Sequence, residues 1–324
     1  MGKRTVQITG QAAGPRERAL EVKADAEAQG FDACAIASVE GADPDNRLRR
    51  WLGLGYHADM DWMTRSAHIR EDVREKVPGA KSVVVVARNY YGPRPDAEVG
   101  TGRVARYAWG RDYHRVLKKP LRRLAAQIDL LEEGARSYCS VDSGPVLERT
   151  WAERAGLAWI GKNSLALRRD MGSWFFLGTV ITTVDLKPDT PEPDWCGTCR
   201  ACIDACPTSA IVEDGVVDSR RCISYQTIEN RGEVPEEVQA GHGDWVFGCD
   251  VCQEVCPWNR FAYQSSETDF LPRPGHANLD LTGLAAMDEP SFRKEFEGTP
   301  ILRARFEGMQ RNGRIVSRNQ EQEG

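Results

Sequence analysis

Eight of the ten cysteines in this 324-residue chain lie close together, at a spacing typical of iron–sulfur ligation. Two, two and three residues separate the first four cysteines, and a proline follows the last. A second run has gaps of two and three residues and also ends in proline, and one cysteine lies between the runs. They are Cys196, Cys199, Cys202, Cys206, Cys222, Cys249, Cys252 and Cys256. Three thiolates so spaced on one tight loop can bind three irons of a [4Fe–4S] cluster.

The Cys-Pro endings predict two clusters that exchange ligands. In bacterial ferredoxins, the fourth cysteine of such a run binds the other cluster. We therefore expect one cluster on Cys196, Cys199, Cys202 and Cys256, and the other on Cys206, Cys222, Cys249 and Cys252. Zinc sites use Cys-x2-Cys pairs and lack these Cys-Pro endings, so the pattern does not favour zinc. Disulfides require an oxidising compartment, and the sequence shows no export signal, so it does not favour disulfides either. The two isolated cysteines, Cys34 and Cys139, stand in strand-like segments and are expected to be buried as small hydrophobes.

Asp142 is the main candidate for acid–base chemistry outside the cysteine runs. It follows a strand-like segment at 136–141, and open α/β sheets place ligand groups at the carboxyl ends of strands. The same residue could simply cap a helix that begins near Val146, and its position alone leaves both roles open. A polar turn at 160–164 could hold a phosphate or be an ordinary loop.

Two further motifs do not support a cofactor site. The sequence Gly100-x-Gly102-x-x-Ala105 follows a loop rather than a strand, so it does not indicate a dinucleotide. The sequence Asp112-x-His114-x-x-Leu117 is similar to a corrinoid-binding motif, but leucine replaces its glycine. We therefore interpret His114 as an ordinary residue on a helix face.

The elements that must position these residues follow from periodicity, glycine and proline. Helices are predicted at 14–30, 47–54, 111–134 and 146–156, with Pro120 as a kink or a restart of the third helix. Strands are predicted at 31–39, 81–90, 136–141 and 174–186. A proline-rich linker follows at 188–193. The fold expected is an α/β domain at 1–187, a bacterial-ferredoxin-like domain at 188–262 and a short helical, basic C-terminal segment at 263–324.

Composition limits the partners. The net charge is −5, and no apolar run is long enough to span a membrane. The first residues contain no apolar export segment, so we expect a cytoplasmic protein. Two basic zones, 102–123 and 301–318, could contact an anionic partner such as RNA.

The motifs together resemble the epoxyqueuosine reductase family. The matching segments are 55–63, 77–90, 106–117, 141–165, the first cysteine run, 221–229 and 247–259. The resemblance implies an α/β domain that binds cobalamin, two [4Fe–4S] clusters and a tRNA substrate. Its activity would be reduction of epoxyqueuosine to queuosine at the wobble position, the final step of queuosine formation. A ferredoxin or flavodoxin would supply electrons, and we expect a monomer.

The resemblance also implies roles for single residues. Asp142 would be the general acid, and we expect an apolar corrin face to raise its pKa. Corrin contacts would come from Arg70, Arg149, Asn163 and Ser224, with the lower base of the cobalamin detached and no histidine in its place. Longer family members continue into a helical-repeat domain that helps to hold tRNA. This chain ends before such a domain, so the basic zone at 102–123 is expected to carry more of the tRNA contact.

Two other function classes remain as alternatives. A cobalamin-dependent reductive dehalogenase would use the same cofactors, but such enzymes usually carry a twin-arginine export signal, and Arg49-Arg50 is internal here. A non-enzymatic two-cluster electron-transfer protein would not need the long patterned region that precedes the cysteines.

Overall fold

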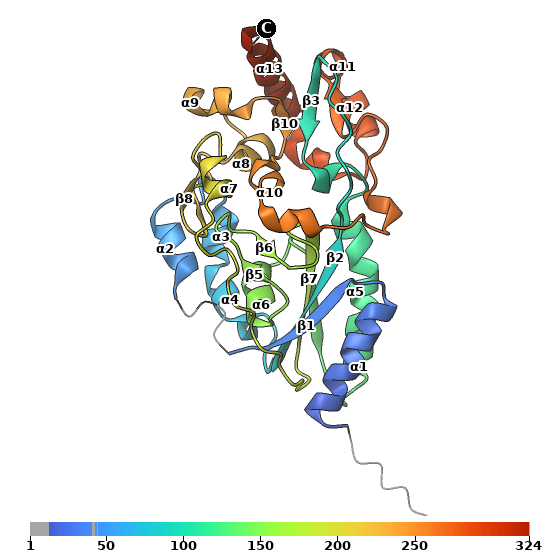
Figure 1. Cartoon of the computed structure of the whole chain (residues 1–324). Coiled ribbons are helices and arrows are strands. Elements are labelled where there is room, and N and C mark those ends of the chain that lie inside the picture. Colours follow the sequence, from blue (N-terminus) through green and yellow to red (C-terminus); the bar gives the residue numbers. More distant parts are fainter. Residues whose placement is uncertain (1–12, 41–42, 44, 324) are drawn as a thin grey trace, which may run out of the picture.

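The structure, a computed structural model, describes residues 13–40, 43 and 45–323 (Figure 1). The first residues, where the sequence predicts no export signal, lie largely outside the described part. No described helix is both long and apolar enough to cross a membrane.

The first sheet has four antiparallel strands in the order β1-β2-β7-β4. They are β1 (Ala33–Ser38), β2 (Ser82–Asn89), β4 (Ser137–Ser140) and β7 (Phe175–Thr182). The predicted α/β class is confirmed, but the sheet is not parallel. The rule that ligands gather at the carboxyl ends of parallel strands therefore does not explain the position of Asp142.

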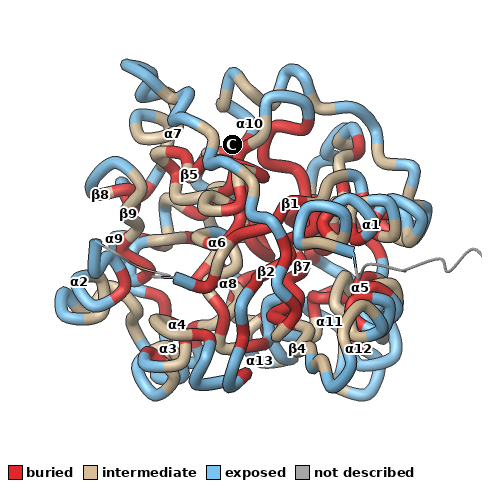
Figure 2. The backbone as a smooth tube through the Cα atoms, turned by 90° about the horizontal axis from the view of Figure 1, so that it is seen from below, coloured by how far each residue is buried: buried red, intermediate tan, exposed pale blue. Residues whose placement is uncertain are grey.

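The centre of this sheet is buried on both faces because β2 contains four consecutive valines, Val83–Val86. Val84 and Val86 point toward α1 (Pro15–Ala28) and α5 (Tyr113–Asp129), whereas Val83 and Val85 face the side covered by α6 (Glu148–Arg154). Figure 2 shows the buried backbone concentrated in β2 and β7. Each fully buried valine contributes about 1.5–3 kcal/mol relative to an exposed one.

Helix α5 carries residues of the site at its first turn. Asp112 caps the helix by accepting a hydrogen bond from the amide of His114. The helix ends at Asp129, earlier than predicted, and the following turn contains Gly134 with a positive φ of 76°. Pro120 lies inside the helix rather than ending it. The apolar face of α5 is buried against the first sheet. This burial outweighs the loss of the hydrogen bond that the proline nitrogen cannot donate.

A second sheet joins the three predicted segments of the chain. Its strands are β3 (Thr101–Val104), β10 (Trp245–Phe247), parallel to β3, and β11 (Asn278–Asp280), antiparallel to β3. Helices α11 (Leu281–Ala286), α12 (Glu289–Glu295) and α13 (Arg305–Glu323) share an apolar core with this sheet. Each predicted segment thus contributes one strand, and the division at 187 and 262 stays a prediction.

The cysteine segment is built from short elements and loops. It contains α7 (Ala201–Asp204), β8 (Ile211–Glu213), β9 (Val216–Val217), α8 (Ile223–Ile228), α9 (Glu236–Gln239) and α10 (Val251–Glu254). Besides β3, α5 and α6, the elements between the strands of the first sheet are α2 (Arg47–Gly53), α3 (Asp61–Arg65), α4 (Ala67–Glu71), β5 (Trp159–Ile160) and β6 (Ala166–Leu167). Short 3-10 helices occur at Val73–Glu75, Arg106–Ala108, Ala240–His242, Pro257–Phe261, Thr268–Phe270 and Pro300–Ala304.

Candidate functional site

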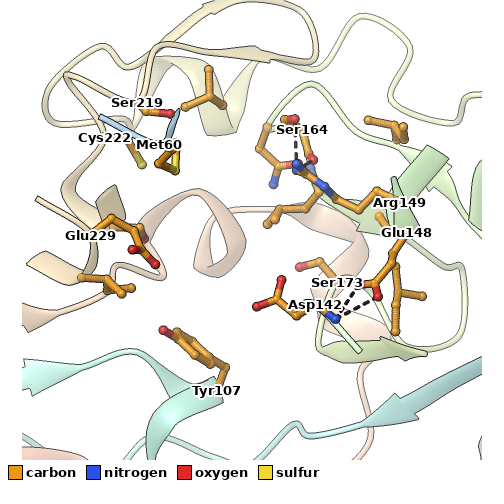
Figure 3. Close-up of a pocket in the computed structure, with 18 of the residues that line it drawn as sticks. Met60, Tyr107, Asp142, Glu148, Arg149, Ser164, Ser173, Ser219, Cys222 and Glu229 are labelled. Carbon is orange, nitrogen blue, oxygen red and sulfur yellow. Dashed lines mark hydrogen bonds between the residues drawn. The ribbon is translucent and has the colours of Figure 1, made fainter. Parts of the chain in front are cut away.

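A cavity of about 1870 Å³ lies among the first sheet, the cysteine segment and the C-terminal segment. Its walls come from α2, α3, the start of α5, the loop after β4, α6, α8 and the residues around Pro300. Pockets for drug-sized ligands measure roughly 300–1,000 Å³, so this cavity has room for a larger cofactor or for two ligands together. Figure 3 shows Asp142, Tyr107 and Glu229 on its inner surface.

Asp142 is held in the cavity wall by a strained turn. Its φ is 56°, in the left-handed region that aspartate tolerates better than most residues. Its backbone amide donates to both carboxyl oxygens of Glu148, at 2.8 and 3.0 Å. Its side chain is 66 % exposed because it faces the open cavity, although protein surrounds that cavity. The turn therefore presents the carboxylate to any ligand that enters.

The residues at the start of α5 complete a group that we call the acid–histidine cluster. Its members are Asp112, Tyr113, His114, Asp142 and Glu148. The Tyr113 hydroxyl donates to Asp142 Oδ2 at 2.7 Å, and His114 Nε2 lies 3.5 Å from the same oxygen. On its other side, His114 Nδ1 lies 2.7 Å from Asp112 Oδ1. The imidazole thus stands between two carboxylates.

These contacts set the charges of the cluster. Burial alone would lower the pKa of His114, but its hydrogen bonds with Asp112 and Asp142 raise it to about 9. Burial alone would raise the pKa of Asp142, but hydrogen bonds from His114 and Tyr113 hold it below its usual value. At neutral pH the proton therefore resides on His114. The expectation that an apolar corrin face raises the pKa of Asp142 concerns the cofactor-bound protein and stays a prediction.

Glu148 lies next to Asp142, and its pKa is shifted in the opposite direction. Burial, followed by the charge of Asp142, raises the pKa of Glu148 to about 8. Ser140 donates to its carboxyl group at 2.9 Å. Glu148 thus anchors the Asp142 turn while staying largely protonated at neutral pH.

The four residues expected to contact a corrin all line the cavity. Arg70 is buried and donates to the Val146 carbonyl at 3.2 Å, while Arg149 binds the backbone and hydroxyl oxygens of Ser164. Asn163 is buried and donates to the Cys252 carbonyl at 3.2 Å. Ser224 lies two residues after Cys222, at the start of α8. Asn163 therefore contacts the cysteine segment, and Ser224 belongs to it.

The eight thiols fall into two neighbouring groups, and none forms a disulfide. After burial, the charges of Cys256, Cys196 and Cys199 raise the pKa of Cys202 to about 11. In the other group, burial and then Cys249 and Cys222 raise the pKa of Cys252 well above its usual value. The two groups adjoin at Cys252, because the charge of Cys202 also raises the pKa of that thiol.

The two groups lie at different depths. Cys206, Cys222, Cys249 and Cys252 line the cavity. Cys199, in the other group, is the most exposed of the eight. The two isolated cysteines, Cys34 on β1 and Cys139 on β4, are half-buried thiols.

A buried ion-pair network fixes the second cysteine run to the second sheet. Asp250 accepts hydrogen bonds from the backbone amide of Arg106 and from the guanidinium of Arg94, both at 2.8 Å. Glu254, one turn later in α10, accepts from Arg106 at 2.8 Å. Removing one partner of such a buried pair typically costs about 3–5 kcal/mol. Part of the basic zone at 102–123 is therefore structural.

Sequence reasoning missed most of the acid–histidine cluster. His114 is not an ordinary residue on a helix face, because its ring lies between Asp112 and Asp142. A usable signal was present: aspartate at a helix N-cap with histidine two residues later places both side chains at the same helix end. Glu148 offered no comparable local pattern.

Comparisons with known proteins agree on one family. The family model "Epoxyqueuosine reductase QueG, DUF1730" matches residues 70–143, and the model "4Fe-4S double cluster binding domain" matches residues 195–259. An epoxyqueuosine reductase from Gloeobacter violaceus is 43 % identical over 303 residues, 91 % of this chain and 94 % of that protein. One from Synechocystis sp. is 44 % identical over 280 residues, 86 % of this chain and 96 % of that protein.

Solved structures give the same result. An epoxyqueuosine reductase crystallised with an epoxyqueuosine-modified tRNA-Tyr stem loop is 30 % identical, with a TM-score of 0.86. The match covers 93 % of this chain and 81 % of that one. The Bacillus subtilis epoxyqueuosine reductase, in a structure whose catalytic aspartate loop is swung out of the active site, has the same TM-score, identity and coverage. The chain described here belongs to the epoxyqueuosine reductase family.

Proposed function

We propose that this protein removes the epoxide oxygen of epoxyqueuosine in tRNA and so forms queuosine at the wobble position, the final step of queuosine formation. The observation that carries the proposal is family membership over about nine-tenths of the chain. Relatives at this identity are named for that reaction, which favours it over reductive dehalogenation or simple electron transfer. Removing the oxygen as water consumes two electrons and two protons, so the site must deliver both.

The donor set fits two [4Fe–4S] clusters. We assign Cys196, Cys199, Cys202 and Cys256 to one cluster and Cys206, Cys222, Cys249 and Cys252 to the other. The mutual effects of these thiols on their pKa values support this crossed assignment. When bound, the clusters supply electrons one at a time. Because Cys199 is exposed and the second group lines the cavity, we place the first cluster on the entry side for electrons.

The cavity fits a corrin in size and in lining. Arg70, Arg149, Asn163 and Ser224 would hold cobalamin, and Asn163 would link it to the cysteine segment through Cys252. Both ring nitrogens of His114 face carboxylates, so Asp112 and Asp142 hold this side chain and it is not expected to bind the cofactor. When bound, cobalamin supplies the strongly reducing metal centre that the epoxide requires.

The acid–histidine cluster would supply the proton. Asp142 faces the cavity and would protonate the departing oxygen, as a catalytic residue. Because its carboxylate is ionised in this structure, it must first be protonated, and the His114 imidazolium 3.5 Å away is the neighbouring source. Asp112 would hold the imidazole in place, and Tyr113 would orient the acceptor oxygen. A bound apolar ligand would desolvate Asp142 and favour the transfer.

The remaining partners follow from the chemistry. The substrate is tRNA, as in the relative crystallised with a stem loop. A ferredoxin or flavodoxin would deliver single electrons to the first cluster, and we expect the enzyme to act as a cytoplasmic monomer. The wobble nucleotide would have to leave its stack to enter the cavity.

The direct test is anaerobic reconstitution with iron, sulfide and cobalamin, followed by turnover of epoxyqueuosine-containing tRNA with a chemical reductant. Mass spectrometry of the nucleosides should show the loss of one oxygen and the appearance of queuosine. Fully reconstituted protein that leaves epoxyqueuosine unchanged would reject the proposal. Halide release from an organohalide under the same conditions would favour a dehalogenase instead.

A further inference from the structure

We propose that Arg115 and Arg273, continued by the exposed basic face of α5, bind the phosphate backbone of the tRNA strand that enters the cavity. The proposal rests on the proposed function, because it names the surface through which that site takes its substrate. It separates the basic side chains that can bind RNA from those that hold the fold together.

Two guanidinium groups converge at one point on the rim of the cavity. A Cβ atom built on Gly298 would lie 3.6 Å from Arg115 Nη1 and 3.6 Å from Arg273 Nη2. Within the described residues, the ion pairs include no carboxylate partner for either side chain within 4.0 Å. Arg273 donates to the backbone oxygen of Glu297 at 2.8 Å. Two neighbouring guanidiniums with no carboxylate between them are suited to bind a phosphate.

This pair is continuous with the site. Arg115 and Gly298 both line the cavity, and Arg115 follows His114 directly in sequence. The amide of Asp112 donates to the Gly298 carbonyl at 2.8 Å, which fastens the C-terminal segment to the start of α5. A phosphate held here would therefore lie beside the acid–histidine cluster without contacting the core of the sheet.

The basic surface extends along α5 away from the cavity. Lys118, Lys119, Arg122 and Arg123 follow Arg115 at intervals of three, four, seven and eight residues, so they share its face of the helix. All five are exposed, while the opposite face buries Leu117, Leu121 and Leu124 in the core. At 1.5 Å per residue this face is about 12 Å long, enough for about three phosphates of a duplex strand.

The rest of the predicted basic zone is committed to other contacts. Arg103 and Arg106 pair with Glu254, and Arg111 pairs with Asp269 at 2.9 Å. Arg273, in contrast, lies far outside the predicted zone in sequence. Three arginines of the predicted zone are therefore held in ion pairs, whereas Arg273 joins the proposed RNA-binding surface.

The test compares two double variants with equal changes in net charge. Arg115→Glu/Arg273→Glu alters the proposed surface. Arg16→Glu/Lys187→Glu alters exposed residues near the start of α1, where the amide of Lys187 donates to the Pro15 carbonyl. Binding of an epoxyqueuosine-containing anticodon stem loop is measured by fluorescence anisotropy from about 50 to about 200 mM salt, without reductant, so that no turnover occurs.

We expect the first variant to weaken binding by about tenfold to a hundredfold and to make the salt dependence shallower by about one to two phosphate contacts. Lys118→Glu/Lys119→Glu should weaken binding by about three- to tenfold, and the control variant by less than about twofold. An unchanged thermal midpoint shows that the variants are folded.

Equal affinities for the wild type and the Arg115/Arg273 variant would overturn the proposal, as would an equal loss in the control. These results concern binding alone. A failure of the proposed function would appear separately, as wild-type enzyme that binds the stem loop but leaves epoxyqueuosine intact.

Discussion

In the proposed reaction the cysteine segment supplies electrons and the acid–histidine cluster supplies a proton, and the two regions are assembled in different ways. The cluster ligands lie between Cys196 and Cys256, and their spacing along the chain already groups them. The acid–histidine cluster joins the start of α5 to the turn after β4 and to α6. Its geometry exists only once the first sheet has formed. Ligand spacing is a local property, whereas a proton-transfer pair depends on tertiary contacts.

The two regions also respond differently to their surroundings. Whether a cysteine can bind a cluster depends on its thiol and on its spacing from the other ligands. The charge of Asp142 depends on His114 and Tyr113, and that of Glu148 depends on Asp142. Substitutions in the first region should therefore remove a cofactor, while those in the second should shift pH profiles and rates.

The largest effect is expected from the cluster ligands. Cys256→Ser should remove the first cluster, reduce the iron content by about half and abolish turnover, because a missing thiolate opens the cluster. Iron analysis and electron paramagnetic resonance of the reduced protein measure this.

The same experiment tests the crossed assignment. Cys199→Ser should eliminate the same resonance signal as Cys256→Ser, and Cys206→Ser should eliminate the other. Cys34→Ser is the matched control and should retain all the iron. If Cys256→Ser and Cys249→Ser abolish one and the same signal while sparing the other, the ligands are not exchanged.

Asp142→Asn should have the next largest effect. The amide keeps the shape of the turn but cannot deliver a proton, so turnover should fall about 10²- to 10⁴-fold with both clusters and the corrin in place. Single-turnover kinetics with reconstituted protein measures the loss. Asp61→Asn, an exposed carboxylate on α3, serves as control. Turnover close to that of the wild type would exclude Asp142 as the acid.

His114→Gln tests the source of that proton. The imidazolium is present below its pKa of about 9, so wild-type turnover should decline as pH rises through that value, and the variant should lack this decline. At neutral pH the variant should be about tenfold slower. A variant whose pH–rate profile matches that of the wild type would remove His114 from the proton path.

The same residue should affect stability in a defined direction. The raised pKa means that His114 stabilises the fold fully below its unfolded value of about 6.5 and loses this contribution as pH rises through about 9. The thermal midpoint of His114→Gln should therefore lie below that of the wild type at pH 6, and the gap should close above pH 9. A gap that widens with pH would contradict the contacts described here.

Glu148→Gln should have the smallest effect, and it should raise the thermal midpoint, whereas His114→Gln lowers it. The ionised carboxylate is destabilising, because burial and Asp142 raise its pKa to about 8. This cost is absent below the unfolded pKa of about 4.5 and complete above about 8. The thermal midpoint of the variant should therefore rise relative to the wild type between these values. A constant difference across this range would show that Glu148 does not titrate.

Local patterns predicted much of the fold. The valine run at 83–86 indicated a buried strand, and β2 lies at the centre of the first sheet. The direction of the strands was not predictable from such runs, because a valine-rich strand is equally suited to a parallel or an antiparallel sheet. Asp142 was singled out from its position, but the residues that lower its pKa in this structure were not predicted. Its partners lie about thirty residues away, on a helix that the sequence alone does not orient.

The sequence by itself determined the two cluster-binding runs and the family, because both depend on residue types at set intervals along one stretch of chain. Only the tertiary structure decided where protons reside and which arginine side chains come together. Arg115 and Arg273 meet at Gly298, and His114 meets Asp142, through packing of segments that are far apart in sequence. Electrostatic interactions act through space over a few ångströms, so they become defined only when the chain has folded.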